Sequence, residues 1–351
     1  MSEPASRPSP GISRTSIFVA AGRAMGAREP DPAARNPDYL VERLLGDPST
    51  LDLDHPAVRA LSLPYEDAMR DVEVVSNVRM MIVRTRFIDE ALDRAIAGGA
   101  TQVVILGAGL DTHAYRCEAL LAHVRVFEVD RPATQALKKQ RVHDVLGGPP
   151  ANLTYVAIDF QHDDLPGVLM RHGYDPAQRT FFILEGVTMY LPEDAVRRTL
   201  RFVAAHPPGS GVVFDFVYRA MVEMLARIDM ANVPEAARPF VERFLNLIKD
   251  EPWVFGLPLG GEREFLAELG LDLREAFTVG GEESLKRYLT RADGTQVGAQ
   301  ALAEATARMA ARTQAVGQSA PDGQPMSAER MQERQRMMAY QLAEAVVAQP
   351  A

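Results

Sequence analysis

Carboxylates and glycines stand at the ends of four short apolar runs of this chain. The first run ends in a glycine turn, Leu106-Gly107-Ala108-Gly109-Leu110. Because glycine has no Cβ, a ligand can approach the backbone closely at such a turn. The second run ends at Glu128-Val129-Asp130, about 20 residues after the turn. An acidic side chain at that distance can accept hydrogen bonds from both ribose hydroxyls of an adenosine-containing cofactor.

Two later runs end in residues of the same kind. Asp159-Phe160 follows the third run, where the acid could accept from the exocyclic amine of adenine and the ring could pack on the base. The alternative role for Asp159 is that of a helix N-cap. Glu185 ends the fourth run, and a buried glutamate is costly unless it is paired or binds a ligand. We expect all four features along one edge of a sheet, where open α/β folds bind ligands.

The glycine turn separates two classes of cofactor only in part. Thr112 stands where the dinucleotide fingerprint G-x-G-x-x-G has its third glycine. A pyrophosphate requires that close approach, whereas S-adenosylmethionine carries no phosphate. The sequence also contains no Tyr-x-x-x-Lys pair, no phosphate-binding G-x-x-x-x-G-K-[ST] loop and no His-Glu-x-x-His. The pattern favours S-adenosylmethionine, and a nicotinamide-dependent oxidoreductase remains the alternative.

Other reactive side chains are scattered, and none predicts a metal site. His113 is expected at the surface, and Cys117, the single cysteine, is expected to be a buried helix residue rather than a nucleophile. One cysteine excludes an internal disulfide framework. The net charge of −9 makes a nucleic-acid partner improbable, and no apolar stretch has the length of a membrane helix. With an N-terminus unlike a signal peptide, these features predict a cytoplasmic protein.

The elements that would position the carboxylates alternate between two periodicities. Short apolar runs are separated by helical patterns such as 193–205, in which Val196, Leu200 and Val203 share one face. This alternation predicts an α/β fold with a parallel sheet covered on both faces. The predicted strands cover residues 102–106, 124–130, 153–159, 180–185 and 211–216, with further strands at 271–279 and 288–289.

Length alone suggests two domains for 351 residues, whereas the pattern along the chain predicts one. Residues 1–13 are rich in Ser and Pro and are predicted to be disordered. The predicted domain covers residues 14–298, and a Met-rich helical stretch at about 218–256 is expected to be an insertion that forms a lid. Residues 299–351, rich in Ala, Gln and Met, are expected to be a helical or partly disordered tail.

The motifs resemble those of the leucine carboxyl methyltransferase family, which belongs to the class I S-adenosylmethionine-dependent methyltransferases. The resemblance rests on Gln102–Arg116, Phe127–Pro132, Asp159-Phe160 and Glu185–Pro192, in this order, and extends over about residues 15–298. It implies a Rossmann-like, mostly parallel seven-stranded sheet with an N-terminal helical extension. His113 stands where bacterial members commonly have Arg.

The resemblance implies roles for the residues of the first two motifs. Gly107 and Gly109 would approach the methionine part of the cofactor. Asp130 would hold the ribose hydroxyls, with Glu128 beside it.

The later motifs, and a helix before the first strand, would complete the cofactor site. Asp159 and Phe160 would bind adenine, and Glu185 would lie near the amino group or the sulfonium. Arg84 matches an arginine that pairs with the cofactor carboxylate in the family, with Arg86 as the second choice. Tyr190 is a candidate substrate contact.

The function implied is S-adenosylmethionine-dependent O-methylation of a carboxylate or hydroxyl, on a small molecule or a protein C-terminus. A small-molecule substrate is the favoured partner. A carboxylate acceptor needs no general base, whereas a hydroxyl acceptor often does, and the sequence identifies no catalytic residue. Besides the oxidoreductase, a non-catalytic protein that binds S-adenosylmethionine remains an alternative.

Overall fold

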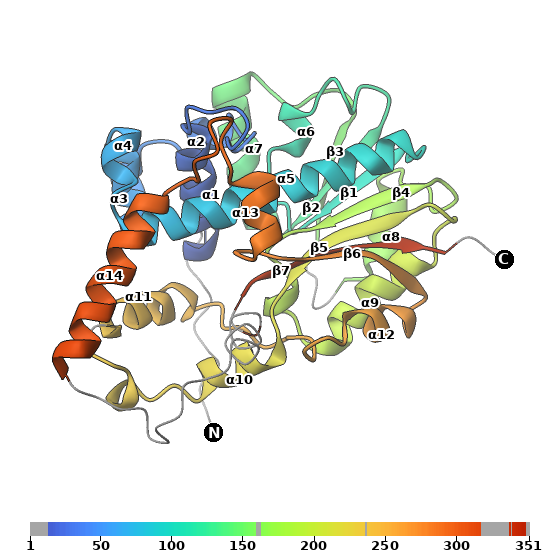
Figure 1. Cartoon of the computed structure of the whole chain (residues 1–351). Coiled ribbons are helices and arrows are strands. Elements are labelled where there is room, and N and C mark those ends of the chain that lie inside the picture. Colours follow the sequence, from blue (N-terminus) through green and yellow to red (C-terminus); the bar gives the residue numbers. More distant parts are fainter. Residues whose placement is uncertain (1–12, 159–162, 236, 317–336, 338, 349–351) are drawn as a thin grey trace, which may run out of the picture.

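A computed structural model describes residues 13–158, 163–235, 237–316, 337 and 339–348. Seven strands form one sheet in the order β3-β2-β1-β4-β5-β7-β6, with helices on both faces (Figure 1). The first five strands are parallel, and β7 runs antiparallel to both of its neighbours. The predicted fold class, a Rossmann-like and mostly parallel sheet, is confirmed. The strands are β1 (Gln102–Leu106), β2 (Arg125–Asp130), β3 (Leu153–Ala157), β4 (Thr180–Leu184), β5 (Gly211–Phe216), β6 (Leu271–Thr278) and β7 (Gln341–Val347).

The central strands are apolar throughout because both of their faces are covered. In β1, Val103 and Ile105 belong to one hydrophobic cluster, whereas Leu106 belongs to the cluster on the opposite face. Successive side chains of a strand point to opposite faces, so a strand between two helical layers needs apolar residues at every position.

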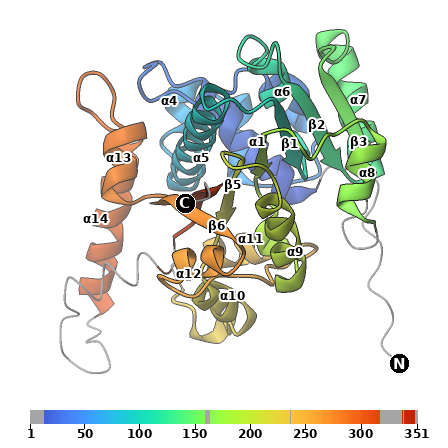
Figure 2. The same ribbon diagram turned by 90° about the vertical axis from the view of Figure 1, so that its right-hand side faces the viewer.

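Each face of the sheet has its own set of helices. Residues of α1, α5, α7 and α13 belong to the first cluster, and residues of α8, α9 and α12 belong to the second. Figures 1 and 2 show α5 and α13 on one side of the sheet and α9 and α12 on the other. The α-helices are α1 (Arg14–Ala27), α2 (Val41–Leu45), α3 (Pro56–Arg59), α4 (Tyr65–Ala68), α5 (Val72–Ala97), α6 (His113–Arg116), α7 (Pro132–Leu146), α8 (Leu165–Arg171), α9 (Glu193–Ala204), α10 (Arg219–Ala226), α11 (Arg238–Ile248), α12 (Glu262–Ala267), α13 (Glu282–Tyr288) and α14 (Ala299–Val316).

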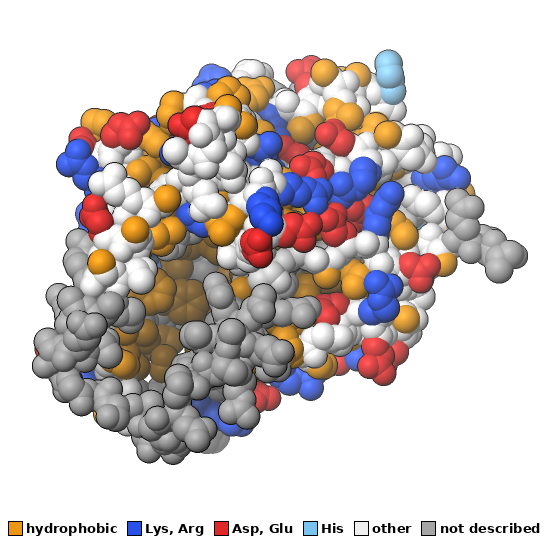
Figure 3. All heavy atoms as spheres, viewed as in Figure 1, with side chains coloured by type: hydrophobic (Ala, Val, Ile, Leu, Met, Phe, Trp, Pro, Cys, Tyr) orange, Lys and Arg blue, Asp and Glu red, His pale blue; other side chains and the backbone are white. Residues whose placement is uncertain are grey.

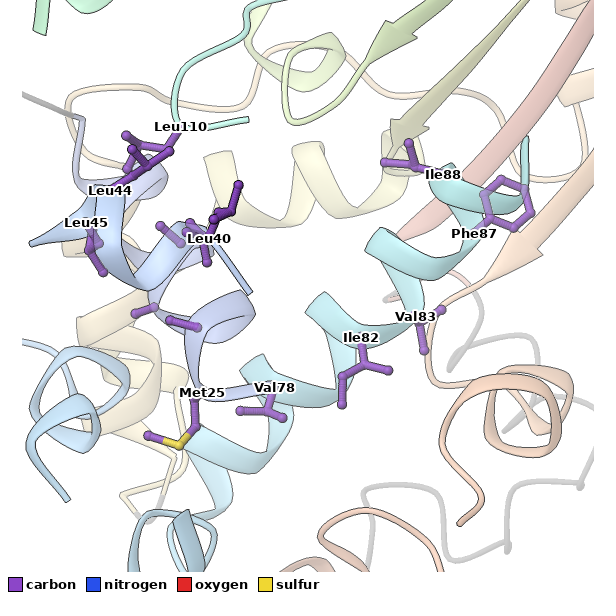
Figure 4. Packing of buried hydrophobic residues seen from close by; sticks show 14 of the residues in the cluster. Met25, Leu40, Leu44, Leu45, Val78, Ile82, Val83, Phe87, Ile88 and Leu110 are labelled. Carbon is purple, nitrogen blue, oxygen red and sulfur yellow. The ribbon is translucent and has the colours of Figure 1, made fainter. Parts of the chain in front are cut away.

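Two glycines let α1 lie directly against α5. A Cβ on Gly22 would meet the Asn77 side chain at 2.5 Å, and one on Gly26 would meet Ile82 at 3.2 Å. Figure 4 shows Met25 of α1 beside Val78 of α5, with Ile82 one turn further along α5. This close packing fixes the N-terminal helix, which supplies part of the wall of the cleft described below.

The last strand of the sheet differs from the prediction. Tyr288 ends helix α13 and is fully buried, so the strand predicted at 288–289 is wrong. The seventh strand is β7, which lies between β5 and β6. The boundary predicted at residue 298 is therefore wrong as well, because the tail contributes an interior strand of the sheet. Within the tail, residues 317–336 and 338 lie outside the described residues.

Two other predicted segments have clear positions. The insertion at about 218–256 contains α10 and α11. The segment predicted to be disordered, 1–13, lies outside the described residues except for Ser13, which accepts a hydrogen bond from the Ser16 N–H as the N-cap of α1. Among the described residues, no helix is both long and apolar enough to cross a membrane.

Candidate cofactor and substrate cleft

A cleft of about 950 Å³, its open mouth included, lies at the carboxyl ends of β1 and β4. Helices α1 and α11 supply its opposite wall. Five of the residues singled out in the sequence line it: Arg84, Gly107, Gly109, Glu185 and Tyr190. The edge of the sheet predicted to bind the cofactor therefore borders a cleft.

The glycine turn after β1 has the backbone conformation that only glycine adopts without strain. The φ angles are +69° at Gly107 and +40° at Gly109. A Cβ on Gly107 would also meet Cγ2 of Val187 at 2.6 Å. The Gly109 N–H donates a hydrogen bond to Oδ2 of Asp130 at 2.6 Å. The two motifs that the sequence places about 20 residues apart are thus in direct contact.

The two acidic residues of β2 have different surroundings. Asp130 also accepts from the Arg131 N–H at 2.6 Å, and burial raises its pKa. Glu128 lies deeper, with its Oε2 2.7 Å from Nζ of Lys138 and 3.3 Å from the Tyr115 hydroxyl. Burial raises the pKa of Glu128 to about 7, although Lys138 opposes the shift. Neither carboxylate lines the cleft directly, and Lys138 was not identified from the sequence.

Arg84 lies at the centre of a buried network at the base of the cleft. Its Nη2 is 2.5 Å from Oε1 of Glu185, and its Nη1 is 3.4 Å from Oδ2 of Asp215. Its Nε is buried and has no hydrogen-bond partner among the described residues. Burial alone would lower the pKa of Arg84, but the two carboxylates hold it above its ordinary value.

Two members of this network were not identified from the sequence. The Tyr340 hydroxyl donates to Oδ2 of Asp215 at 2.8 Å, and the Gly186 N–H lies 2.8 Å from Oδ1 of the same carboxylate. Asp215 resembles the other candidates, since it is a carboxylate near the end of an apolar strand, and that signal could have found it. Tyr340 stands just before β7 and had no such signal, because its strand was not predicted.

Beside the glycine turn, Asp111 and His113 form a buried pair. Nδ1 of His113 is 2.6 Å from Oδ2 of Asp111, and its Nε2 is 3.0 Å from Oδ1 of Asp89. His113 is 1% exposed, so the expectation of a surface residue is wrong. Burial alone would lower its pKa, but the Asp111 carboxylate raises that pKa to about 9.

Asp111 and His113, together with Glu185, form a group that could in principle bind a metal ion. Ligand atoms of Asp111, His113 and Glu185 lie within 4.8 Å of one another. A metal ligand must be a neutral imidazole, whereas the carboxylates of Asp111 and Asp89 on either side of His113 favour its protonated form. The group therefore suits a charged network better than a metal ion.

The remaining predictions have mixed outcomes. Asp159 and Phe160 lie outside the described residues. Cys117 is half-buried just after α6, and burial raises the pKa of its thiol to about 12, which disfavours a nucleophilic role. Tyr190 faces the cleft near the apolar wall that includes Phe244 and Trp253, whose rings meet edge to face at 5.5 Å.

The chain is similar to the members of one protein family. The leucine carboxyl methyltransferase family matches residues 16–204. A relative from Mycolicibacterium smegmatis is 38% identical over 202 residues, which cover 57% of this chain and 65% of the relative. One from Frankia alni is 34% identical over 208 residues, covering 58% and 68%. Both carry the name of an S-adenosylmethionine-dependent methyltransferase, and the matched region spans about two thirds of their length.

Among solved structures, a methyltransferase from Thermobifida fusca aligns with a TM-score of 0.45 at 14% identity, over 93% of this chain and 98% of that one. The family match and the two relatives agree with the motifs on which the resemblance rests. The predicted enzyme class and its cofactor, S-adenosylmethionine, are thereby confirmed at the level of the family. The chain belongs to the leucine carboxyl methyltransferase family.

Proposed function

We propose that this protein is an S-adenosylmethionine-dependent O-methyltransferase that acts on a small molecule. The observation that carries the proposal is the division of one cleft into two parts. A glycine turn and the Arg84–Glu185 pair form one part, and an apolar wall from α1 and α11 forms the other. Such a cleft can hold a charged cofactor and an organic acceptor side by side.

The residues present fit the cofactor. Gly107 has the positive φ that the tight turn requires, and Arg84 has a buried N–H without a partner among the described residues. Arg84 would hold the cofactor carboxylate, and Glu185 and Asp111 would face its ammonium or sulfonium. Asp130 would accept from the ribose hydroxyls, and its contact with the Gly109 N–H keeps it at the turn. Asp159 and Phe160 remain the candidates for adenine.

Catalysis in this cleft would depend mainly on positioning. S-adenosylmethionine supplies a methyl group that its sulfonium already activates. The chain would align the acceptor oxygen with that methyl group and keep water away, and such alignment contributes up to about 7–11 kcal/mol in favourable cases. The Thr15 hydroxyl donates to Glu251 at 2.5 Å and so links α1 to the insertion, which would help to keep water away.

Calorimetry with S-adenosylhomocysteine and with NAD tests the cofactor class. We expect S-adenosylhomocysteine to bind and NAD not to bind, because Thr112 stands at the third position of the dinucleotide fingerprint. Binding of NAD alone would support the oxidoreductase alternative. Cofactor binding without methyl transfer to any carboxylate or hydroxyl in a broad screen would support a non-catalytic binding protein.

Substitution of Asp130 tests the ribose assignment. We expect Asp130→Ala to weaken S-adenosylhomocysteine binding roughly 10- to 100-fold, because hydrogen bonds to a charged group contribute about 1.5–3 kcal/mol each. Asp130→Asn keeps one acceptor oxygen for the Gly109 N–H and should lose less. Calorimetry measures both variants, and an unchanged affinity in Asp130→Ala would show that the assignment is wrong.

A further inference from the structure

Four charged residues line the cleft, and both cations among them, Arg23 and Arg84, are already paired with carboxylates. Arg23 donates to the Leu110 carbonyl at 3.0 Å and pairs with Asp38 at 2.8 Å, so it is fixed beside the glycine turn. Arg84 is likewise paired with a carboxylate, that of Glu185, at 2.5 Å. The lining side chains that we assign to the acceptor end are apolar or neutral: Thr15, Ser16, Phe18, Val19, Met80, Tyr190, Phe244, Leu247, Ile248 and Trp253.

This distribution discriminates between the two possible acceptor groups. Burying a carboxylate costs far more free energy than burying a hydroxyl, unless a cation lies beside it. Among the described residues that line the acceptor end there is no Arg, Lys or His. A negative charge lies beside it, since Glu251 accepts from Thr15 and helps to raise the pKa of Tyr190. The cation that pairs with Glu251, at 3.6 Å, is the exposed Arg131.

A hydroxyl acceptor must lose a proton, and the cleft contains a route for it. Tyr340 lines the cleft, and its hydroxyl donates to Asp215 at 2.8 Å. Asp215 itself is fully buried, so a proton from the cleft would reach it through Tyr340. Burial raises the pKa of Asp215 to about 6, against the influence of Arg84, so it is ionised at neutral pH and can accept a proton.

Resting on the proposed methyltransferase function, we propose that the acceptor is a neutral, apolar molecule with a hydroxyl group, and that Tyr340 relays its proton to Asp215. A lone pair of the acceptor oxygen forms the new bond to the methyl carbon, and the electrons of the breaking carbon–sulfur bond stay on sulfur. The acceptor proton passes to the Tyr340 oxygen while the proton of Tyr340 passes to Oδ2 of Asp215. The positive charge on sulfur and the negative charge on Asp215 are both neutralised.

Two probes with one apolar skeleton test the acceptor class by binding alone. The full-length protein is first saturated with S-adenosylhomocysteine, a step whose failure would refute the proposed function rather than this inference. It is then titrated in a calorimeter at pH 7.5 with 2-naphthol, which is neutral, and with 2-naphthoate, which is an anion. We expect 2-naphthol to bind at least about tenfold more tightly. Equal or tighter binding of 2-naphthoate, or no binding of either probe, would overturn the inference.

A matched variant should reverse this preference. Met80 lines the acceptor end and is half-buried, so Met80→Arg would place a cation there. We expect 2-naphthoate to bind this variant at least about tenfold better than it binds the unchanged protein. If S-adenosylhomocysteine still binds and the affinity for 2-naphthoate does not rise, the charge argument is wrong.

Substitution of Tyr340 tests the proton relay. We expect Tyr340→Phe to lower the rate of methyl ether formation from 2-naphthol by about 10²-fold or more, with S-adenosylhomocysteine affinity within threefold. In the unchanged protein the rate should fall on the acidic side of the Asp215 pKa, near 6, and Asp215→Asn should abolish that dependence. Tyr39→Phe, at an exposed tyrosine, is the control. An unchanged rate in Tyr340→Phe, or a protein that binds 2-naphthol without methylating it, would contradict the relay.

Discussion

At the scale of single residues, Gly107 combines two constraints that a side chain would violate. Its φ is +69°, and a Cβ would meet Val187 at 2.6 Å inside the proposed cofactor site. We expect Gly107→Ala to weaken S-adenosylhomocysteine binding at least about tenfold. Gly280 shares the positive φ, +85°, but has open space around it, so Gly280→Ala should cost about 1–2 kcal/mol of stability and leave binding unchanged. Equal effects of both variants on calorimetric affinity would contradict this reading.

At the same scale, Lys138 and Glu128 form a buried ion pair. Both side chains are almost fully buried, so removing one leaves an uncompensated charge. We expect Lys138→Met to lower the free energy of unfolding in urea by about 3–5 kcal/mol. The double variant Glu128→Leu/Lys138→Met should recover most of that loss, and Lys139→Met, at the exposed neighbouring lysine, should have little effect. A double variant as unstable as Lys138→Met would argue for a role of the pair beyond mutual neutralisation.

Residues of the site could be predicted from the sequence where they stand at the ends of strands. Gly107, Gly109, Asp130 and Glu185 follow apolar runs, and the parallel sheet brings those ends together. Arg84 lies on the long helix α5, where its charge alone does not distinguish it from its neighbours, so only the family resemblance identified it. Tyr340 and Lys138 reach the site, or support it, through tertiary packing that no local pattern encodes.

At the scale of elements, β7 is the strand on which the sheet depends. It pairs with β5 on one side and β6 on the other. Its loss would therefore expose the edge of β5 and detach β6 from the sheet. We expect truncation after residue 316 to abolish cooperative thermal unfolding and S-adenosylhomocysteine binding. Glu304→Ala, at an exposed residue of α14, is the control and should retain both. A truncated protein that unfolds cooperatively and binds the ligand would show that β7 is dispensable.

The elements were predictable where their pattern was local. The first five strands match the predicted runs closely, because continuous apolar runs that end in glycine or a charge are typical of buried parallel strands. β7 has the sequence Gln-Leu-Ala-Glu-Ala-Val-Val, which is rich in helix-forming residues. Tertiary context overrides that preference, since Ala343 and Ala345 pack against the second cluster while Arg94 and Arg274 neutralise the buried Glu344.

At the scale of the whole molecule, partly exposed ion pairs link the edge strand β6 to two helices. Glu275 of the edge strand β6 pairs with Arg94 of α5 and Arg287 of α13. Figure 3 shows positive and negative side chains side by side on this face of the molecule. Charges on an edge strand disfavour pairing with another sheet. The same view shows a hollow with a hydrophobic floor beside α14.

The deprotonation of His113 should make the stability of the fold depend on pH in the alkaline range. Its pKa is raised from 6.5 to about 9 in the folded protein, by Asp111 and Asp89 and against Arg116. The protonated imidazole therefore stabilises the fold fully below pH 6.5, and this contribution is lost as the pH rises to 9. We expect the thermal midpoint to fall over that range, and to fall less in His113→Gln than in His123→Gln, at an exposed histidine. The same slope in both variants would exclude His113 as the cause.

The position of β7 has a consequence for the synthesis of the chain. Thr278 of β6 and Gln341 of β7 are hydrogen-bonded across 63 residues of sequence, and β5 also meets β6 only through β7. On the ribosome, which adds about 5–20 residues per second, β6 therefore waits roughly 3–13 s for its neighbour. During that interval the nascent sheet carries an exposed β5 edge, so the growing chain is most vulnerable to misassociation just before its last strand emerges.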